Sequence, residues 1–221
     1  MSSKNPPSDS DRSILCFPAL RGASFWKMPE DTLRKRLLAA VREKADRAIE
    51  GDRVVFDESR QNWPLIRTRH VQCAVFSLLV QYRVTGRSEY REAVLRQLRQ
   101  MAEWEYWSWS GWRARDSRPE ADFDLSYSEN SLTVAMVFDA LRGELSGVES
   151  REIVDLARRR CILPYLAMNP SREKRARWFA KPYKNWNGVC NGGVGMLALV
   201  MRPLISESED VLERVEESLQ P

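Results

Sequence analysis

Histidine is nearly absent from this sequence and its cysteines are scattered, which limits the kinds of site that the chain can hold. His70 is the only histidine, so a metal centre built from several imidazole ligands is excluded. The cysteines have no C-x-x-C spacing, which predicts neither a zinc site nor a disulfide framework. They are Cys16, Cys73, Cys161 and Cys190. We expect no metal and no cofactor, and we expect Cys190 to be a packed thiol.

Long apolar runs are also missing. No run approaches the ~18 residues of a membrane-spanning helix, so no membrane partner is expected. The first residues, Met1 to Arg12, are polar and rich in proline and serine. They lack the charged start and the apolar core of a signal peptide. The compartment of the protein is left open by these observations.

No long block of one charge sign occurs either. The 35 basic and 31 acidic residues are intermixed and leave a net charge of +4, which indicates a mildly basic surface. Such a surface suits an acidic polysaccharide, although it is not specific for one. No nucleic-acid-binding motif is present, so nucleic acid is not expected as a partner.

The chain does contain the apolar periodicity of helices, and no strand pattern accompanies it. We predict an all-α fold of stacked antiparallel helical hairpins that occupies residues 30–221, after a tail of residues 1–29. The tail carries Phe17, Leu20, Phe25 and Trp26, which are apolar enough to dock on a surface. The predicted helices cover about 31–50, 66–84, 89–106, 126–141 and 150–163, one that follows the asparagine-rich stretch 185–193 and ends near Pro203, and one from about 206 to the C-terminus.

Several residues are expected to cap, kink or end these helices. Gly51 and Gly86 stand where the first two helices should end, because glycine readily adopts the left-handed conformation of a helix terminus. Capping boxes are predicted to begin at Ser126 and at Ser206, each with a glutamate three residues later. Pro164 should kink or end the fifth helix.

The most unusual stretch is Asn185–Gly193, with the sequence Asn-Trp-Asn-Gly-Val-Cys-Asn-Gly-Gly. Asparagine and glycine both weaken a helix, so their crowding before the apolar run 194–201 calls for an explanation. One interpretation is a capped entry to a buried helix whose glycines allow close packing. The other is a set of backbone and amide groups aimed at a polar ligand. Both interpretations stay open on these residues.

Asn185–Gly193 resembles the N-W-N-x-V-C-N-G-G signature of heparinase II/III-like and alginate-lyase-like polysaccharide lyases. A second stretch, Phe123–Asn130 leading into Ala135–Leu141, is similar to an aspartate loop and the following helix of that family. At Ala140 the chain departs from the pattern, because an aromatic residue is expected there. The resemblance spans roughly residues 30 to 205, and only the first motif is specific.

This resemblance implies that the motif lies on the inner wall of an (α/α) toroid. A closed toroid of the family needs about twice as many helices, so the chain is expected to be an incomplete toroid, truncated at its C-terminus. Its last hairpin should leave an apolar edge uncovered, through which copies of the chain could associate. Members of the family are commonly periplasmic or secreted.

The resemblance also implies cleavage of an acidic, uronate-containing polysaccharide by β-elimination. Asn185 and Asn187 are the candidates to neutralise the uronate carboxylate, whereas Asn191 is expected to be a structural cap. The family's catalytic tyrosine and histidine lie downstream of the motif, and this chain has no counterparts there. Tyr127 is the best local tyrosine, although a partly buried helix-start aromatic is the simpler reading. His70 is expected to be structural.

Sugar contacts are expected from aromatic and basic residues near the motif. Five aromatics fall between Trp104 and Trp112, and they either line a sugar-binding groove or wedge between helices. We expect Trp107 and Trp112 to be the exposed ones. The candidate substrate contacts are Trp107, Trp112, Arg177, Tyr183, Lys184 and Trp186.

Two other functions remain open. The first is a non-catalytic helical-repeat module that binds a glycan or a protein, which an uncovered apolar edge would favour. The second is a glycoside hydrolase, which needs two facing carboxylates. Its candidate carboxylates are Glu103, Glu105, Asp122 and Asp124, and no spacing singles out a pair. Without the family's acid and base, weak or no lyase activity is expected from this chain.

Overall fold

The computed structural model describes residues 14–15, 31–51, 58–60, 62–109, 123–168 and 181–220. Within these ranges the chain is all-helical, as predicted, and it forms seven helical segments and no strand. They are α3 (Thr32–Glu50), α4 (Trp63–Thr85), α5 (Ser88–Glu103), α6 (Leu125–Leu141), the continuous segment α7 (Gly147–Ala157), η4 (Arg158–Ile162) and α8 (Leu163–Ala167), then α10 (Asn185–Met201) and α11 (Ser208–Leu219). A short 3-10 turn, η3 (Arg142–Glu144), follows α6.

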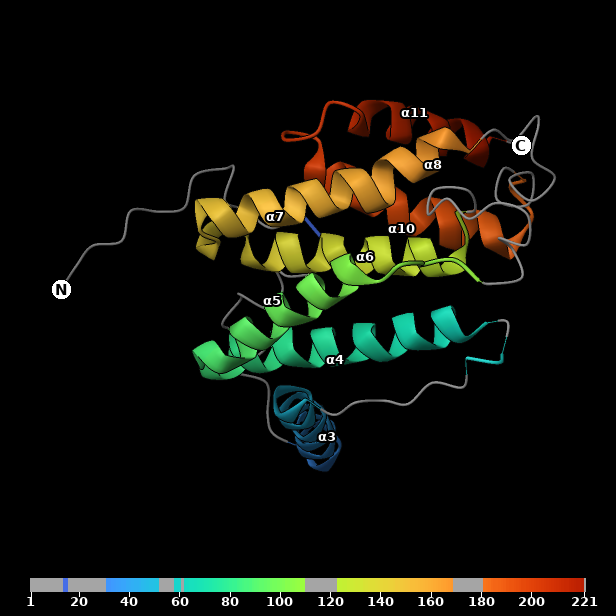
Figure 1. Cartoon of the computed structure of the whole chain (residues 1–221). Helices are drawn as coiled ribbons and strands as arrows, with labels where there is room; N and C mark the ends of the chain where they lie inside the picture. The colour runs from blue at the N-terminus through green and yellow to red at the C-terminus, as the bar shows by residue number, and fades with distance from the viewer. Residues whose placement is uncertain are drawn as a thin grey trace.

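The helices alternate in direction, as Figure 1 shows. Helices α4, α6 and α10 all begin at the end of the molecule drawn on the right, and α6 packs between α4 and α10. Helices α5, α7–α8 and α11 run back toward that end and contact their predecessors in the chain. The first helix, α3, packs on α4 and α5. The starts of α4, α6 and α10 and the ends of α5 and α8 therefore lie at one end of the molecule, which we call the N-terminal end of the inner helices.

Glycine ends the first two helices where it was predicted. Gly51 has φ 83° and Gly86 has φ 71°, and the N–H group of each closes the last helical turn by donating to Arg47 O and Tyr82 O respectively. Only glycine adopts this left-handed conformation without a steric cost. The turn after Gly86 is short, and α4 and α5 are antiparallel neighbours as expected.

The two predicted capping boxes are wrong. Helix α6 is capped by Asp124, whose side chain accepts from the N–H groups of Ser126 and Tyr127, so Ser126 already lies inside the helix. Helix α11 begins at Ser208 after Glu207, with no side-chain cap. A capping box does occur at Ser146, where the Ser146 and Glu149 side chains each bond to the other's backbone N–H group.

Pro164 does not end its helix. The five residues before Leu163 form a π-helical turn, and the Leu163 N–H group donates to Arg158 O. The chain then continues helically through Pro164 to Ala167, and the proline falls in the first turn of α8. A proline is tolerated there because the helix needs no N–H donor at that position.

Helix α6 forms the centre of the core. Thirteen of its 17 residues are buried, small polar residues among them, and burial on nearly all sides matches its position between the other helices. By contrast, α3 is buried mainly in its second half, where Ala45 is fully enclosed. The predicted apolar face of this helix is exposed in its first half, since Leu33 and Leu37 are 64% and 58% exposed.

The N-terminal tail is attached to the body at one described point. Asp139 of α6 is fully buried, and its two carboxylate oxygens accept from Ile14 N at 2.7 Å and from Leu15 N at 3.0 Å. Leu15 also packs against the hydrophobic core. The residues predicted to dock, Phe17, Leu20, Phe25 and Trp26, lie outside the described ranges. None of the described helices is both long and apolar enough to span a lipid bilayer.

Candidate functional site

The N-terminal end of the inner helices gathers the tryptophans of the described chain. Trp63 opens α4, and Trp186 lies in the first turn of α10. Trp104 ends α5, and Trp107 and Trp109 follow it in the connection to α6. The helix ends around them appear on the right of Figure 1. This concentration of aromatic side chains makes the end of the molecule the natural place to search for a site.

Helix α10 begins inside the asparagine-rich motif rather than after it. Its first residue is Asn185, and Lys184 occupies the cap position without a side-chain hydrogen bond to the helix. Asn185 is exposed, and its amide makes no hydrogen bond with the other described residues. The first N–H groups of a helix lack intrahelical partners and carry partial positive charge. An exposed amide therefore stands beside an electropositive helix start.

Asn187 and Asn191 face the opposite way, into the protein. Asn187 Nδ2 donates to Ser218 O at 3.0 Å, and Asn191 Nδ2 donates to Ser218 Oγ at 2.7 Å. Asn191 Oδ1 accepts from the Tyr165 hydroxyl at 2.8 Å. Both asparagines are 1% exposed. They fasten α10 to α8 and α11, so Asn191 is structural as predicted, although it does not cap α10.

Tyr127 is also turned away from solvent. It is fully buried in the first turn of α6, and its ring packs on Phe123, with centroids 5.4 Å apart, and on Trp107, at 5.6 Å. A buried hydroxyl cannot reach the leaving oxygen of a polysaccharide on the surface. The arrangement of Tyr127 thus fits the simpler reading of a packing aromatic, and it is even more buried than that reading assumed.

The prediction that Trp107 is exposed is wrong. Its side chain is fully buried, and its indole nitrogen donates to Met101 O at 3.0 Å. The guanidinium of Arg160 covers the ring at 5.1 Å from its centroid. The chain after α5 turns back over the end of that helix and buries the Trp107 indole in the core. The other tryptophan expected to be exposed, Trp112, lies outside the described ranges, as does Arg177.

Two more tryptophans are engaged by a single arginine. The guanidinium carbon of Arg67 lies 4.5 Å from the ring centroid of Trp63 and 3.7 Å from that of Trp104. Arg67 also donates to Tyr106 O at 2.6 Å, so it joins α4 to the chain after α5. A cation over an aromatic face stabilises both groups and occupies that face. Trp63 and Trp104 therefore help to hold α4 and the chain after α5 together.

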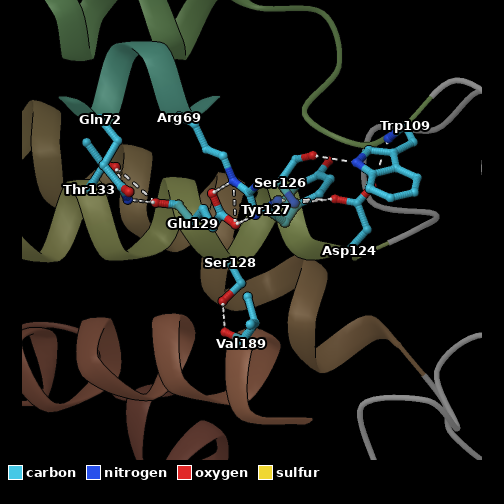
Figure 2. A network of polar contacts seen from close by, with 10 residues as sticks. All are labelled: Arg69, Gln72, Trp109, Asp124, Ser126, Tyr127, Ser128, Glu129, Thr133 and Val189. Atoms are coloured by element: carbon cyan, nitrogen blue, oxygen red, sulfur yellow. Dashed lines mark hydrogen bonds and ion pairs between the residues drawn. The ribbon is translucent and has the colours of Figure 1, made fainter. Parts of the chain in front are cut away.

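Trp109 is held by the first turn of α6 (Figure 2). Its backbone N–H donates to Asp124 Oδ2 at 2.8 Å, and its indole N–H donates to Ser126 Oγ at 3.0 Å. Its ring meets the ring of Trp186 edge to face, with centroids 5.9 Å apart and an interplanar angle of 73°. Both tryptophans are half-buried. This tryptophan pair, Trp109 and Trp186, bridges the starts of α6 and α10.

Basic residues stand beside the pair. Lys181 and Lys184 are exposed, and their ammonium nitrogens lie 5.9 Å and 5.5 Å from the ring centroid of Tyr183. Tyr183 itself is 74% exposed. The predicted contacts Tyr183, Lys184 and Trp186 thus occur together with Asn185 in consecutive positions at an accessible surface. Their positive charge and aromatic surface suit an anionic sugar.

The sequence did not lead us to predict one polar pair near the site. Arg69 of α4 donates to both carboxylate oxygens of Glu129 of α6, at 2.7 and 2.9 Å, and Gln72 donates to Glu129 O at 3.0 Å (Figure 2). Glu129 had been assigned to a capping box, which hid its role. The available signal was a charged residue on a helix that is otherwise uncharged in its first three turns, because a glutamate needs a partner when it is mostly covered.

The carboxylates considered for glycoside hydrolysis do not form an evident pair. Glu103 and Glu105 are exposed, and Asp122 lies outside the described ranges. Asp124 is fully buried and is used as a helix cap, and burial raises its pKa to about 7 even though three backbone N–H groups favour its charged form. Nothing in this arrangement offers two facing carboxylates to a glycosidic bond.

No metal centre is found in the part of the chain that the structure describes, since it contains no group of three potential ligands. Cys161 and Cys190 are buried, and burial raises the pKa of both thiols, to about 12 for Cys161. Cys190 is therefore a packed, unreactive thiol as predicted. His70 is partly buried on α4.

Comparisons with known proteins add no assignment. No family model matches the sequence, and a search of curated proteins finds no match.

Proposed function

We propose that this chain binds an acidic, uronate-containing glycan at the start of α10, and that it is the N-terminal part of a polysaccharide lyase of the heparinase II/III-like kind. The observation that carries the proposal is the position of Asn185. It is exposed in the first turn of α10, and the exposed Lys184, Tyr183 and Lys181 precede it directly. A uronate carboxylate and the hydroxyls around it match such a surface.

The electrostatics of this surface favour a carboxylate. The partial positive charge at a helix start attracts anions, and the exposed ammonium groups of Lys181 and Lys184 add to it. The Asn185 amide donates hydrogen bonds without titrating, so it would hold a carboxylate over a wide pH range. Trp186, in the same helical turn, offers apolar surface for a sugar ring.

The helix arrangement supports the toroid part of the proposal. Three helices that start at one end, α4, α6 and α10, lie side by side, and each is followed by a helix that returns (Figure 1). In an (α/α) toroid the corresponding helices would form the inner wall. Apolar side chains on α10 and after it are exposed, including Leu199, Leu204 and Leu219 at 44%, 52% and 58%. We propose that this edge contacts further helices or a second copy of the chain.

Elimination needs a base and an acid besides carboxylate neutralisation. Tyr127 is buried, and Asn187 is committed to Ser218. Of the tyrosines predicted to be local to the motif, Tyr183 is the most exposed. We therefore propose that this chain binds the glycan and contributes Asn185 to carboxylate neutralisation, and that by itself it eliminates slowly or not at all.

The test is a glycan titration of the full chain. Alginate, heparan sulfate and hyaluronan oligosaccharides would be titrated while tryptophan fluorescence is followed, with ultraviolet absorbance of the unsaturated uronate product as a parallel readout. Asn185→Ala should weaken binding about tenfold, as expected for one hydrogen bond to a charged group. Asn62→Ala is the matched control, because Asn62 is an exposed asparagine at the start of α4.

Lys184→Ala should also weaken binding and reduce its dependence on salt. Arg36→Ala removes the same charge from the exposed side of α3 and should change neither. Equal losses with Asn185→Ala and Asn62→Ala, or no binding of any of the three glycans, would contradict the proposal. An increase in product absorbance that requires Asn185 would show instead that the chain is a complete lyase, with Tyr183 the first residue to test as its acid.

A protein-binding helical module is the alternative, and the exposed leucines favour it. If it is correct, Leu199→Glu should abolish self-association or partner binding and should leave glycan binding unchanged. Light scattering across a concentration series measures the first of these.

A further inference from the structure

We propose that Asp124 is a positioning residue, which fixes Trp109 against Trp186 so that the two indoles form a platform for a pyranose ring of the bound glycan. This inference rests on the proposed function, and it adds a residue that would never touch the glycan.

The Asp124 carboxylate joins two separate parts of the chain. Its Oδ1 atom accepts from Ser126 N at 2.8 Å and from Tyr127 N at 3.2 Å, and so caps α6. Its Oδ2 atom accepts from Trp109 N at 2.8 Å, fifteen residues earlier in the chain. The side chain is fully buried, so these bonds are shielded from water. A single side chain therefore sets the distance between Trp109 and the start of α6.

Both the backbone N–H and the indole N–H of Trp109 are held by hydrogen bonds. The backbone is held by Asp124, and the indole N–H donates to Ser126 Oγ, at 3.0 Å, in the first turn of α6. Figure 2 shows both bonds on the same side of α6. A tryptophan with its backbone and its ring nitrogen both held has little rotational freedom left, so little is lost when a ligand binds to it.

The partner indole comes from the proposed glycan site. Trp186 directly follows Asn185, and its ring centroid lies 5.9 Å from that of Trp109 in an edge-to-face arrangement. Both rings are half-buried, so each retains accessible surface. Of the other described tryptophans, Trp107 is fully buried, and Trp63 and Trp104 pack on Arg67.

The class of ligand follows from this combination. A sugar ring has an apolar face that packs on an indole, and a uronate adds a carboxylate at the ring edge. With the ring against the tryptophan pair, that carboxylate would point toward Asn185 and Lys184 at the start of α10. The platform thus selects a cyclic sugar acid rather than any small anion. Acetate would share the charge contacts and lack the stacking.

The experiment compares Asp124→Ala and Trp109→Leu with wild type in the full chain, using near-ultraviolet circular dichroism and titration with oligouronates. Coupled indoles held edge to face give a characteristic signal, which Trp109→Leu must remove. If the inference holds, Asp124→Ala removes the same signal and weakens oligouronate binding about tenfold, while acetate binding is unchanged. Ser146→Ala is the control, since it removes the cap of α7 at the other end of the molecule.

The outcomes separate this inference from the proposed function. Retention of the dichroic signal and of full affinity in Asp124→Ala overturns the positioning role and leaves the proposed function standing. Loss of the signal in Trp109→Leu with unchanged affinity overturns the platform. If the wild-type chain binds no oligouronate, the proposed function and the platform fail together. Asp124→Asn, which keeps one acceptor oxygen in place, should recover part of both signal and affinity.

Discussion

Gly193 of α10 lies directly against Ser128 of α6. A Cβ atom built on Gly193 would stand 2.9 Å from the Ser128 carbonyl carbon, and still closer to its hydroxyl and carbonyl oxygens. At the same crossing the Ser128 hydroxyl lies 2.5 Å from Val189 O and 2.9 Å from Cys190 O, to which it donates (Figure 2). The two helices approach so closely because neither residue has a large side chain.

Gly193→Ala should therefore destabilise the protein by about 3 kcal/mol or more, since backbone atoms would have to move apart. Gly192→Ala is the matched control. Gly192 is exposed, and a Cβ there meets no atom within 4 Å, so its replacement should stabilise α10 by about 0.5–1 kcal/mol. Urea unfolding measures both. Equal effects of the two substitutions would contradict the close crossing.

A second prediction concerns the fastening of α8, α10 and α11. Asn191→Ala would leave the Tyr165 hydroxyl and Ser218 without their buried partner, and we expect a loss of about 2–3 kcal/mol. Tyr165→Phe removes only the hydroxyl and should cost about 1 kcal/mol. The double variant should be less destabilised than the sum of the two, because both remove the same bond. Additive losses would show that the bond contributes nothing.

The pH dependence of stability should contain a contribution from Asp124. Burial raises its pKa from 3.8 to about 7, so the folded protein binds a proton more tightly than the unfolded chain. This contribution is fully present below pH 3.8 and is lost as the pH rises through about 7, with an upper limit of about 4 kcal/mol. The Cys190 thiol, on which Asp124 acts from α6, stays protonated in this range because burial raises its pKa.

Asp124→Asn removes this titration and keeps an acceptor at the cap. Between pH 4 and pH 7 the free energy of unfolding of wild type should therefore fall relative to that of the variant. Chemical denaturation at several pH values measures the difference. A wild type that gains stability relative to the variant over this range would show that the hydrogen bonds from Trp109, Ser126 and Tyr127 outweigh burial, and that the pKa lies below 3.8.

The attachment of the N-terminal tail gives a fourth prediction. Asp139→Ala removes the acceptor of Ile14 N and Leu15 N, so hydrogen exchange of these two amides should become at least tenfold faster. Asp155→Ala is the control, because Asp155 forms an exposed i,i+4 ion pair with Arg159 on α7 and should affect neither amide. Unchanged exchange in Asp139→Ala would mean that Leu15 packing alone holds the tail.

Much of the helical pattern was predictable from the sequence, for reasons that are local. Gly51 and Gly86 end helices because of their own backbone freedom, and the buried run in α4 is visible as apolar residues. The capping of α6 was mispredicted because Ser126 and Asp124 are both good caps, and only the contact with Trp109 favours Asp124. That contact joins residues fifteen positions apart, and no local pattern contains it.

The candidate site was predictable only in part. The motif Asn185–Gly193 contains both buried and exposed residues, and the packing interpretation applies to its buried part, whereas the ligand interpretation stays a prediction for Asn185. Gly193, Asn187 and Asn191 serve packing and fastening, whereas Asn185 is exposed. Helical periodicity separates them, since Asn187 and Asn191 share a face that Asn185 does not. Burial of Trp107 was beyond the sequence, because it depends on how the chain turns after α5.

The enclosure of α6 has a consequence for synthesis of the protein. Thirteen of the 17 residues of this helix are buried in the folded protein, and one of its main packing partners, α10, begins 44 residues after α6 ends, at Asn185. While the ribosome makes the intervening residues, α6 has α4 and then α7 and η4 beside it, and the side that α10 covers in the folded protein stays open. A nascent chain paused in this interval would expose the aggregation-prone surface of α6 that α10 covers in the folded protein. Translation stalls or stop codons between residues 141 and 185 should therefore yield aggregates that need chaperones, whereas completion of α10 should release the chain from them.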